Sequence, residues 1–143
     1  FADNFLEYWN EDCLNRNLSS LKDLIFNNNI LKSFKIKYLI NLIWLNLHFN
    51  ELTRLENNTF QSLRNLEILS LHKNRINFID FNAFMELDKV HFLDLNENEL
   101  KILRANRFLN MTKLFHLKLI KNRINSIEKN SFKGLESTLS ILN

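Results

Sequence analysis

The sequence predicts an α/β fold: a right-handed solenoid, bent into a horseshoe, with a short-stranded parallel sheet on its concave face. The first observation is an asparagine that recurs every 24 residues, at Asn50, Asn74, Asn98 and Asn122. The second is a phenylalanine with the same period, at Phe60, Phe84, Phe108 and Phe132. Self-similarity at a fixed period of about 20–50 residues is the mark of repeat architectures.

A short strand opens each repeat, most clearly in the stretch LEILSLHKN that begins at Leu66. Apolar and variable residues alternate there, which is the period of a β-strand. Strands that recur in one direction after a return segment must lie parallel, about 4.8 Å apart. Crossovers between such strands are right-handed in nearly all known cases. The leucines then point inward, and neighbouring coils bury each other's apolar faces.

Along the chain, residues 1–17 fit this pattern poorly and are expected to be a degenerate N-terminal repeat or a cap remnant. Residues Phe1 to Cys13 are either the end of a preceding repeat or a short helix. Residues 18–143 are expected to hold about five full repeats and a partial sixth. Because the chain starts without Met and stops within a repeat, we expect it to be a segment of a longer protein.

The asparagine and phenylalanine columns are expected to be structural. The asparagine follows the strand, where a buried amide can bond the backbone of its own turn and of the adjacent coil. A buried backbone group left unpaired costs about 1–3 kcal/mol. Stacked phenylalanine rings on the return side would pack into a spine. The residues assigned to this role are Asn29, Asn50, Asn74, Asn98, Asn122, Phe60, Phe84, Phe108 and Phe132.

The net charge of +3 comes from interspersed acids and bases, which argues against the clustered basic face that nucleic-acid binding needs. No apolar run approaches the ~20 residues that a membrane-spanning helix requires. The glycine-rich phosphate loop, the H-E-x-x-H motif and the G-x-S-x-G motif are all missing from the sequence. We therefore expect no catalytic site, no cofactor, no metal site, no nucleic-acid partner and no membrane span.

The repeated motif L-x-x-L-x-L-x-x-N, with its 24-residue spacing and its phenylalanine, resembles the leucine-rich repeat family. Within the family it resembles the class called typical, found in Toll-like receptors, Slit, chaoptin and small proteoglycans. The resemblance covers Leu18 to Asn143, and FKGLESTLSILN from Phe132 looks like arthropod Toll or chaoptin repeats. The cysteine-rich caps of extracellular members are missing, so the resemblance implies an incomplete array or ends that other chains cover. Cys13, the single cysteine, is either a buried small hydrophobe or half of a disulfide with an upstream partner.

The resemblance implies that partners bind on the concave sheet, where the variable strand positions are expected to face solvent. Trp44, Ile68 and Phe92 follow each other in one column, and apolar patches of that kind commonly mark interfaces. Alternatively, another segment or an assembly neighbour covers them permanently. The residues expected to bind a partner are Trp44, Asn46, His48, Phe49, Ile68, Ser70, His72, Lys73, Phe92, Asp94, Asn96, Glu97, His116, Lys118 and Lys121.

His48 and His72 share a column in adjacent repeats. They are either solvated surface residues or a pair that responds to acidic pH, because protonating both would bring like charges together. Two histidines without a third ligand are weak support for a metal.

Three N-x-S/T sequons are candidate glycosylation sites: Asn17, Asn57 and Asn110. With 24 Asn and 13 Ser plus Thr in 143 residues, chance gives 24 × 13 / 143, or roughly two sequons, so they do not establish secretion. Asn110 is the best candidate, since its column is polar or small. Asn57 aligns with Phe81 and Ala105 and is expected to be partly buried.

The leading functional hypothesis is a protein-binding module of an extracellular or cell-surface receptor or adhesion protein. Its partner would be a protein ligand or co-receptor, and the array would also contact flanking repeats or form an oligomer. Two alternatives stay open: a structural scaffold subunit of a larger assembly, and an intracellular leucine-rich repeat regulator.

Overall fold

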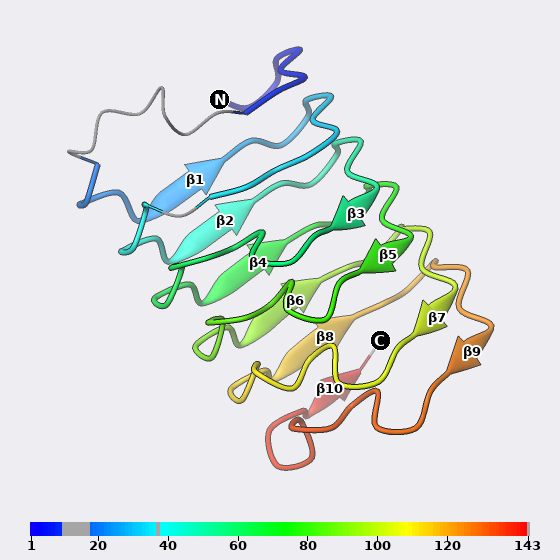
Figure 1. Cartoon of the computed structure of the whole chain (residues 1–143). Helices are drawn as coiled ribbons and strands as arrows, with labels where there is room; N and C mark the ends of the chain where they lie inside the picture. The colour runs from blue at the N-terminus through cyan, green and yellow to red at the C-terminus, as the bar shows by residue number, and fades with distance from the viewer. Residues whose placement is uncertain (10–17, 37, 143) are drawn as a thin grey trace.

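The computed structural model describes residues 1–9, 18–36 and 38–142. Short coils stack side by side into a solenoid, with the two ends of the chain at opposite ends of the stack (Figure 1). Parallel strands on one side of every coil line up into one sheet, which confirms the predicted solenoid. Cys13 and Asn17 lie outside the described residues, so the predictions made for them stay untested by the structure.

The main sheet contains six strands in chain order, and each neighbouring pair is parallel. These strands are β1 (Asp23–Ile25), β2 (Trp44–Asn46), β4 (Ile68–Ser70), β6 (Phe92–Asp94), β8 (His116–Lys118) and β10 (Ile141–Leu142). Trp44 pairs with Ile68, Ile68 with Phe92, and Phe92 with His116. Residues 24 apart in the sequence therefore stand side by side on the sheet.

Four shorter strands lie on the other side of the coils, which we call the return side (Figure 1). They form two separate parallel pairs, not one continuous sheet. The first pair is β3 (Arg54–Leu55) with β5 (Phe78–Ile79), and the second is β7 (Ile102–Leu103) with β9 (Ser126–Ile127). The gap between β5 and β7 falls in the middle of the molecule.

One apolar core runs the length of the solenoid between the main sheet and the return side, filled by the leucine columns. Each fully buried leucine contributes about 1.5–3 kcal/mol. The rings of Phe60 and Phe84 stack at 6.2 Å, and those of Phe84 and Phe108 at 5.9 Å. Phe132, next in the column, is half-buried. The phenylalanines thus form a spine along the return side.

Asn74 shows how the asparagine column joins neighbouring coils. Its Nδ2 donates to the carbonyls of Leu71 at 3.1 Å and of Leu47, in the preceding coil, at 2.9 Å. Its Oδ1 accepts from the amide of Leu52 at 3.1 Å. The same pattern recurs at Asn29, Asn50, Asn98 and Asn122. Each side chain satisfies backbone groups that the strand ends leave unpaired.

The helical part of the predicted α/β class is not confirmed, since the described residues form strands and turns but no helix. The return segments are successive tight turns. The turns are closed by backbone hydrogen bonds, such as that from the Thr59 amide to the Glu56 carbonyl or from the Leu63 amide to the Phe60 carbonyl. Asn58 and Ser62 have φ values of 59° and 70°, in the left-handed region. A residue with that φ cannot continue a right-handed helix, so each turn ends after a few residues.

Residues 1–9 form no helix, while residues 10–13 of the stretch for which a short helix was one alternative lie outside the described residues. Residues 1–9 run beside the first full coil and match its residues 26–34, from the end of the strand through the asparagine turn. The Asn29 Nδ2 donates to the carbonyl of Phe1, and the Asn29 Oδ1 accepts from the amide of Leu6. The rings of Phe1 and Trp9 pack on Phe26 at 5.0 and 4.6 Å. These nine residues therefore cover the apolar end of the core.

A candidate binding surface on the main sheet

The concave face, meaning the outer surface of the main sheet, carries the apolar column that the sequence singled out. Trp44, Ile68 and Phe92 are brought side by side by the strand register and are half-buried. They line an open groove of about 600 Å³. The complete lining is Trp44, Asn46, Ile68, Ser70, His91, Phe92, Phe115 and His116.

Two residues of this groove, His91 and Phe115, were missed from the sequence. Both directly precede a strand of the main sheet, at β6 and β8, in a column that was not expected to reach the face. Phe115 is 48% exposed, more than any residue of the predicted apolar column. The sequence did hold a signal for Phe115, because a large aromatic side chain directly before a strand can extend the apolar surface of that strand by one residue.

Neighbouring side chains shelter the apolar column. The His116 ring meets the Phe92 ring edge-on at 5.1 Å, and the Lys118 Nζ lies 5.0 Å from the Phe92 ring centroid. The same ammonium lies 3.9 Å from Asp94 Oδ2. The groove therefore combines an aromatic floor with a nearly neutral charged margin.

The expectation of an exposed Asn46 is wrong, because this side chain is only 7% exposed. Its Oδ1 accepts from the His48 amide at 3.1 Å and lies 2.6 Å from the His48 Nδ1. Asp94 makes the equivalent bond to the Asn96 amide at 2.9 Å. Short polar side chains that bond a backbone amide two residues ahead stabilise turns. These two residues therefore hold the strand ends, and Asn46 has little surface left for a partner.

A second cluster lies where the chain leaves the strands. The rings of His48 and His72 lie 6.5 Å apart, and the ring of Phe49 contacts both, at 5.2 and 5.9 Å. The Lys73 Nζ lies 4.3 Å from the Phe49 ring centroid. Burial, and then the nearby His72, lower the pKa of His48. The neutral imidazole is thus the favoured form of His48 in the folded protein.

The column just before the asparagines has a backbone conformation that the sequence did not reveal. The φ angle lies between 50° and 56° at every member of this column, namely Asn28, Phe49, Lys73, Glu97 and Lys121. Aromatic and long side chains rarely adopt this region. In the first four of these residues the backbone amide nevertheless donates to a carbonyl of the next coil, as in the bond from Phe49 to His72 at 3.0 Å. The repeat geometry thus imposes the left-handed turn on any residue type.

Charged side chains at the end of this face pair with one another. Glu97 accepts from Lys121 at 3.1 Å and lies 3.9 Å from the Lys73 Nζ. The hydrogen bond from Lys121, together with the attraction of that ammonium, lowers the pKa of Glu97. The described residues hold no group of three His, Cys, Asp or Glu side chains arranged to bind a metal.

The two described sequon residues, Asn57 and Asn110, lie away from the concave face. Asn110 is exposed on a return-side turn, with the hydroxyl-bearing Thr112 also exposed. Asn57 is exposed too, so the expectation that it is partly buried is wrong. Its Oδ1 accepts from the Asn82 amide at 2.9 Å, which turns the side chain along the surface. Thr59, the hydroxyl residue of that sequon, is buried and donates to the Glu56 carbonyl at 2.8 Å.

Comparisons with known proteins agree with this geometry. The family model described as leucine rich repeat matches residues 40–100. No curated protein gives a significant match. Among solved structures, the crystal structure of a TLR13–ssRNA13 complex is similar, with 28% sequence identity and a TM-score of 0.63. The match covers 87% of this chain and 21% of that chain, so this chain spans about a fifth of its length.

The repeats, the family match over residues 40–100 and the structural match support a leucine-rich repeat protein, as the sequence predicted. This fold and its TLR13 neighbour support a module that binds a protein or another ligand. No helix in the described part of the chain is long and apolar enough to cross a membrane.

Proposed function

We propose that this chain is part of a receptor or adhesion protein and binds a protein partner on its concave face. The observation that carries the proposal is the groove of about 600 Å³ over Trp44, Ile68 and Phe92. Aromatic residues in such positions dominate the binding energy of protein interfaces. The margin of paired charges around the groove suits the polar rim of such an interface.

The lysines of the face favour a protein over a nucleic acid. Lys118 lies 3.9 Å from Asp94, and both Lys73 and Lys121 lie within 4.0 Å of Glu97. A phosphate backbone needs unpaired cations, because its affinity comes from the counterions that they replace. A protein segment needs only apolar contact and a few polar partners.

The binding test uses peptides that are selected from a displayed random library because they bind the purified chain. The double variant Trp44→Ala/Phe92→Ala should bind the selected peptides at least tenfold more weakly, since each hot-spot truncation costs about 1–2 kcal/mol or more. Ile127→Ala is the matched control, because Ile127 is exposed on the return side. Equal binding by the double variant and the wild type would refute the proposed site, provided that both unfold at the same temperature.

A second candidate ligand is single-stranded RNA, favoured by the TLR13–ssRNA13 neighbour and by aromatic rings beside lysines on the concave face. Stacking of bases on aromatic rings contributes about 1–3 kcal/mol per base. A fluorescent oligoribonucleotide tests this ligand by polarisation. Binding that weakens both in the Trp44→Ala/Phe92→Ala variant and steeply with added salt would support RNA over protein.

We also propose an extracellular or endosomal location, which rests on the likeness to TLR13. Of the two described sequons, Asn110 is the better acceptor, because both its amide and Thr112 are exposed. Secretion from a eukaryotic cell should therefore yield a glycan that the Asn110→Gln variant lacks. A secreted chain of unmodified mass would count against Asn110, and the Asn57→Gln variant separates the two sites.

A further inference from the structure

Arg107 departs from its column. The residue just before each core phenylalanine is small and buried in three other coils: Thr59, Ala83 and Ser131 are each 1–2% exposed. In the fourth coil this position holds Arg107, which is half-buried. A guanidinium stays charged in proteins, so partial burial requires hydrogen-bond partners and space. The neighbouring coils must supply both.

The Arg107 side chain takes the place of a main-chain bond between two coils. Its Nε donates to the carbonyl of Ile79 at 2.9 Å, and its Nη1 donates to the carbonyl of Ala105 at 2.9 Å. On either side of this point the equivalent carbonyl accepts a backbone amide, and the Leu103 carbonyl also accepts the Ser131 hydroxyl at 2.6 Å. The backbone bonds run from Asp80 to Leu55 at 2.8 Å and from Glu128 to Leu103 at 2.9 Å.

The return-side sheet is interrupted at the same place. Strands β3 and β5 pair, and so do β7 and β9, while β5 and β7 do not (Figure 1). Arg107 bonds the last residue of β5, Ile79, so its side chain stands at the interruption. We attribute the interruption to the size of this side chain, because the smaller Ser131 bonds the equivalent Leu103 carbonyl and leaves the backbone bond from Glu128 in place.

A cavity of about 180 Å³ opens at the interruption. An engineered cavity of about 150 Å³ in another protein takes up benzene, so this one has room for a single aromatic ring. Buried Ile79, Leu103 and Phe108 contribute to its walls, and exposed Lys101 and Ile102 mark its opening. The full lining is Asn77, Phe78, Ile79, Leu100, Lys101, Ile102, Leu103, Arg104, Arg107 and Phe108.

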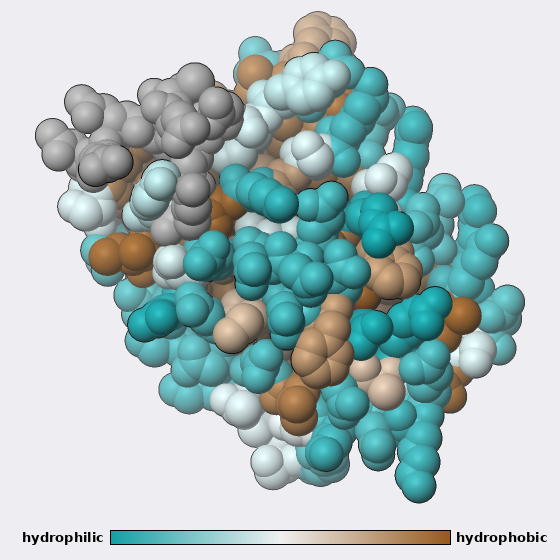
Figure 2. Space-filling view, in the orientation of Figure 1, coloured by the Kyte–Doolittle hydropathy of each residue, from teal (hydrophilic) through white to brown (hydrophobic). Residues whose placement is uncertain are grey.

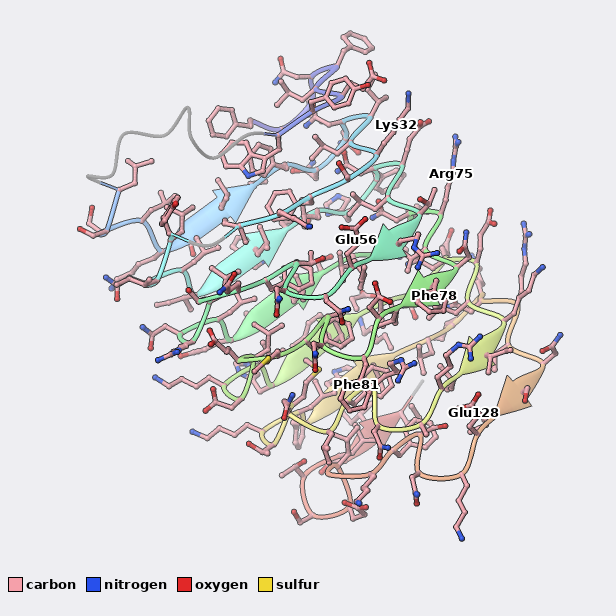
Figure 3. The ribbon with its side chains drawn as sticks, in the orientation of Figure 1. Lys32, Glu56, Arg75, Phe78, Phe81 and Glu128 are labelled. Carbon is pink, nitrogen blue, oxygen red and sulfur yellow. The ribbon has the colours of Figure 1, made fainter. Side chains whose placement is uncertain are left out.

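The lining carries positive charge only: Lys101, Arg104 and Arg107, with no carboxylate among the lining residues. Figure 3 shows Phe78 on this side of the solenoid, with Glu128 two coils further along. Arg104 lies 5.3 Å from the centre of the Phe78 ring, and its Nη1 lies 3.7 Å from Glu128 outside the cavity. The surrounding surface is mostly hydrophilic, with apolar side chains in small patches (Figure 2). A partly open, mainly apolar cavity beside cations is therefore a local feature, not part of a wide docking surface.

We propose that this cavity binds a small organic anion: a carboxylate carried on a body the size of a benzene ring. The ring would lie against Phe78 and Phe108, and the carboxylate would accept hydrogen bonds from Arg107 and Arg104. Arginine matches carboxylates in geometry, and such charge-assisted bonds are about twice as strong as neutral ones. The proposal is independent of the concave face and of any partner bound there.

Benzoate is the probe, and its binding is measured by calorimetry and by ligand-observed NMR. We expect a dissociation constant on the order of 1 mM, as for other ligands of this size. Benzyl alcohol, which keeps the ring without the charge, and acetate, which keeps the charge without the ring, should each bind at least tenfold more weakly. Equal binding of benzyl alcohol and benzoate would overturn the role of the cations, and no benzoate binding at 20-fold higher concentration, about 20 mM, would overturn the site.

The Arg107→Ser variant should lose benzoate binding at least tenfold, because serine restores the small residue found at Ser131. The Arg123→Ser variant, which removes an exposed arginine paired with Glu99, is the control and should bind normally. Amide exchange at Arg104 should slow in Arg107→Ser, as the main-chain bond to Ile79 becomes possible. If Arg107→Ser does not fold, Ile102→Trp serves instead by filling the opening. Wild-type affinity in either folded variant would refute the proposal.

Discussion

Replacing Asn74 by alanine tests how much the asparagine column stabilises the stack of coils. The change removes bonds to the carbonyls of Leu47 and Leu71 and to the amide of Leu52. Asn74 is 7% exposed, so water does not readily replace these bonds. The Leu52 amide is left unpaired, which costs about 1–3 kcal/mol. The carbonyls of Leu47 and Leu71 keep bonds from Asn50 and Asn98, so each loses one bond at about 0.5–1.5 kcal/mol. We therefore expect a loss of about 2–6 kcal/mol in unfolding free energy.

Asn122 provides the matched control for this prediction. Its side chain makes the same three bonds, to Leu95, Leu119 and Leu100, at 2.9 to 3.1 Å. It is half-buried, so water can bond the backbone groups that Asn122→Ala leaves behind. We expect that variant to lose about 1–2 kcal/mol, less than half the loss at Asn74.

Urea unfolding followed by circular dichroism measures both variants. The slope of free energy against urea should stay unchanged, since a changed slope would mean that the coils no longer unfold together. A loss below about 1 kcal/mol for Asn74→Ala would refute the reasoning, because buried backbone groups would then tolerate the missing partner. Equal losses in the two variants would show that burial does not set the magnitude.

Two further predictions concern pH and the backbone. Because the pKa of His48 is lowered in the folded protein, the unfolded chain takes up a proton first as pH falls below about 6.5. The unfolding free energy should therefore decline as pH falls from that value to the pKa of His48 in the folded protein. The His48→Gln variant should show a weaker decline, while the control His91→Gln, which changes an exposed residue, should decline as the wild type does. Equal pH dependence of the wild type and His48→Gln would contradict this. Gly134→Ala should lower the unfolding free energy by about 1–3 kcal/mol, because Gly134 has φ 93° and an added Cβ would lie 2.8 Å from the Leu109 carbonyl oxygen. Thermal unfolding beside Ser137→Ala measures the second effect, and equal stability of the two variants would rule it out.

The fold was predictable because every coil repeats the same local pattern and contacts only its neighbours. Spacing alone placed Trp44 beside Ile68 and Ile68 beside Phe92, as the register shows. The expectation of helical content failed at the return turns. There the left-handed backbone occurs in Ser62, Glu86 and Gly134, three residue types with no common signature.

The sequence predicted which residues of the candidate binding surface stand in one column, but it did not predict which of their side chains are exposed. Asn46 occupies a face position in the pattern, yet its amide bonds back to His48 and leaves the surface. Phe115 lies outside the expected columns, yet it lines the groove. Side-chain direction at a strand end depends on the hydrogen bonds of that turn, which a repeat spacing does not encode.

By itself, the amino-acid sequence determined the coil length, the parallel register, the inward leucines and the asparagine that links the coils, because these follow from a period that each coil repeats. Only the tertiary structure decided how Arg107 is accommodated. In the sequence it is one arginine in a column of small residues. In the fold it takes the Ile79 carbonyl from the backbone ladder and leaves a cavity beside itself. A break in pairing depends on space between two coils, and that space exists only once they are stacked.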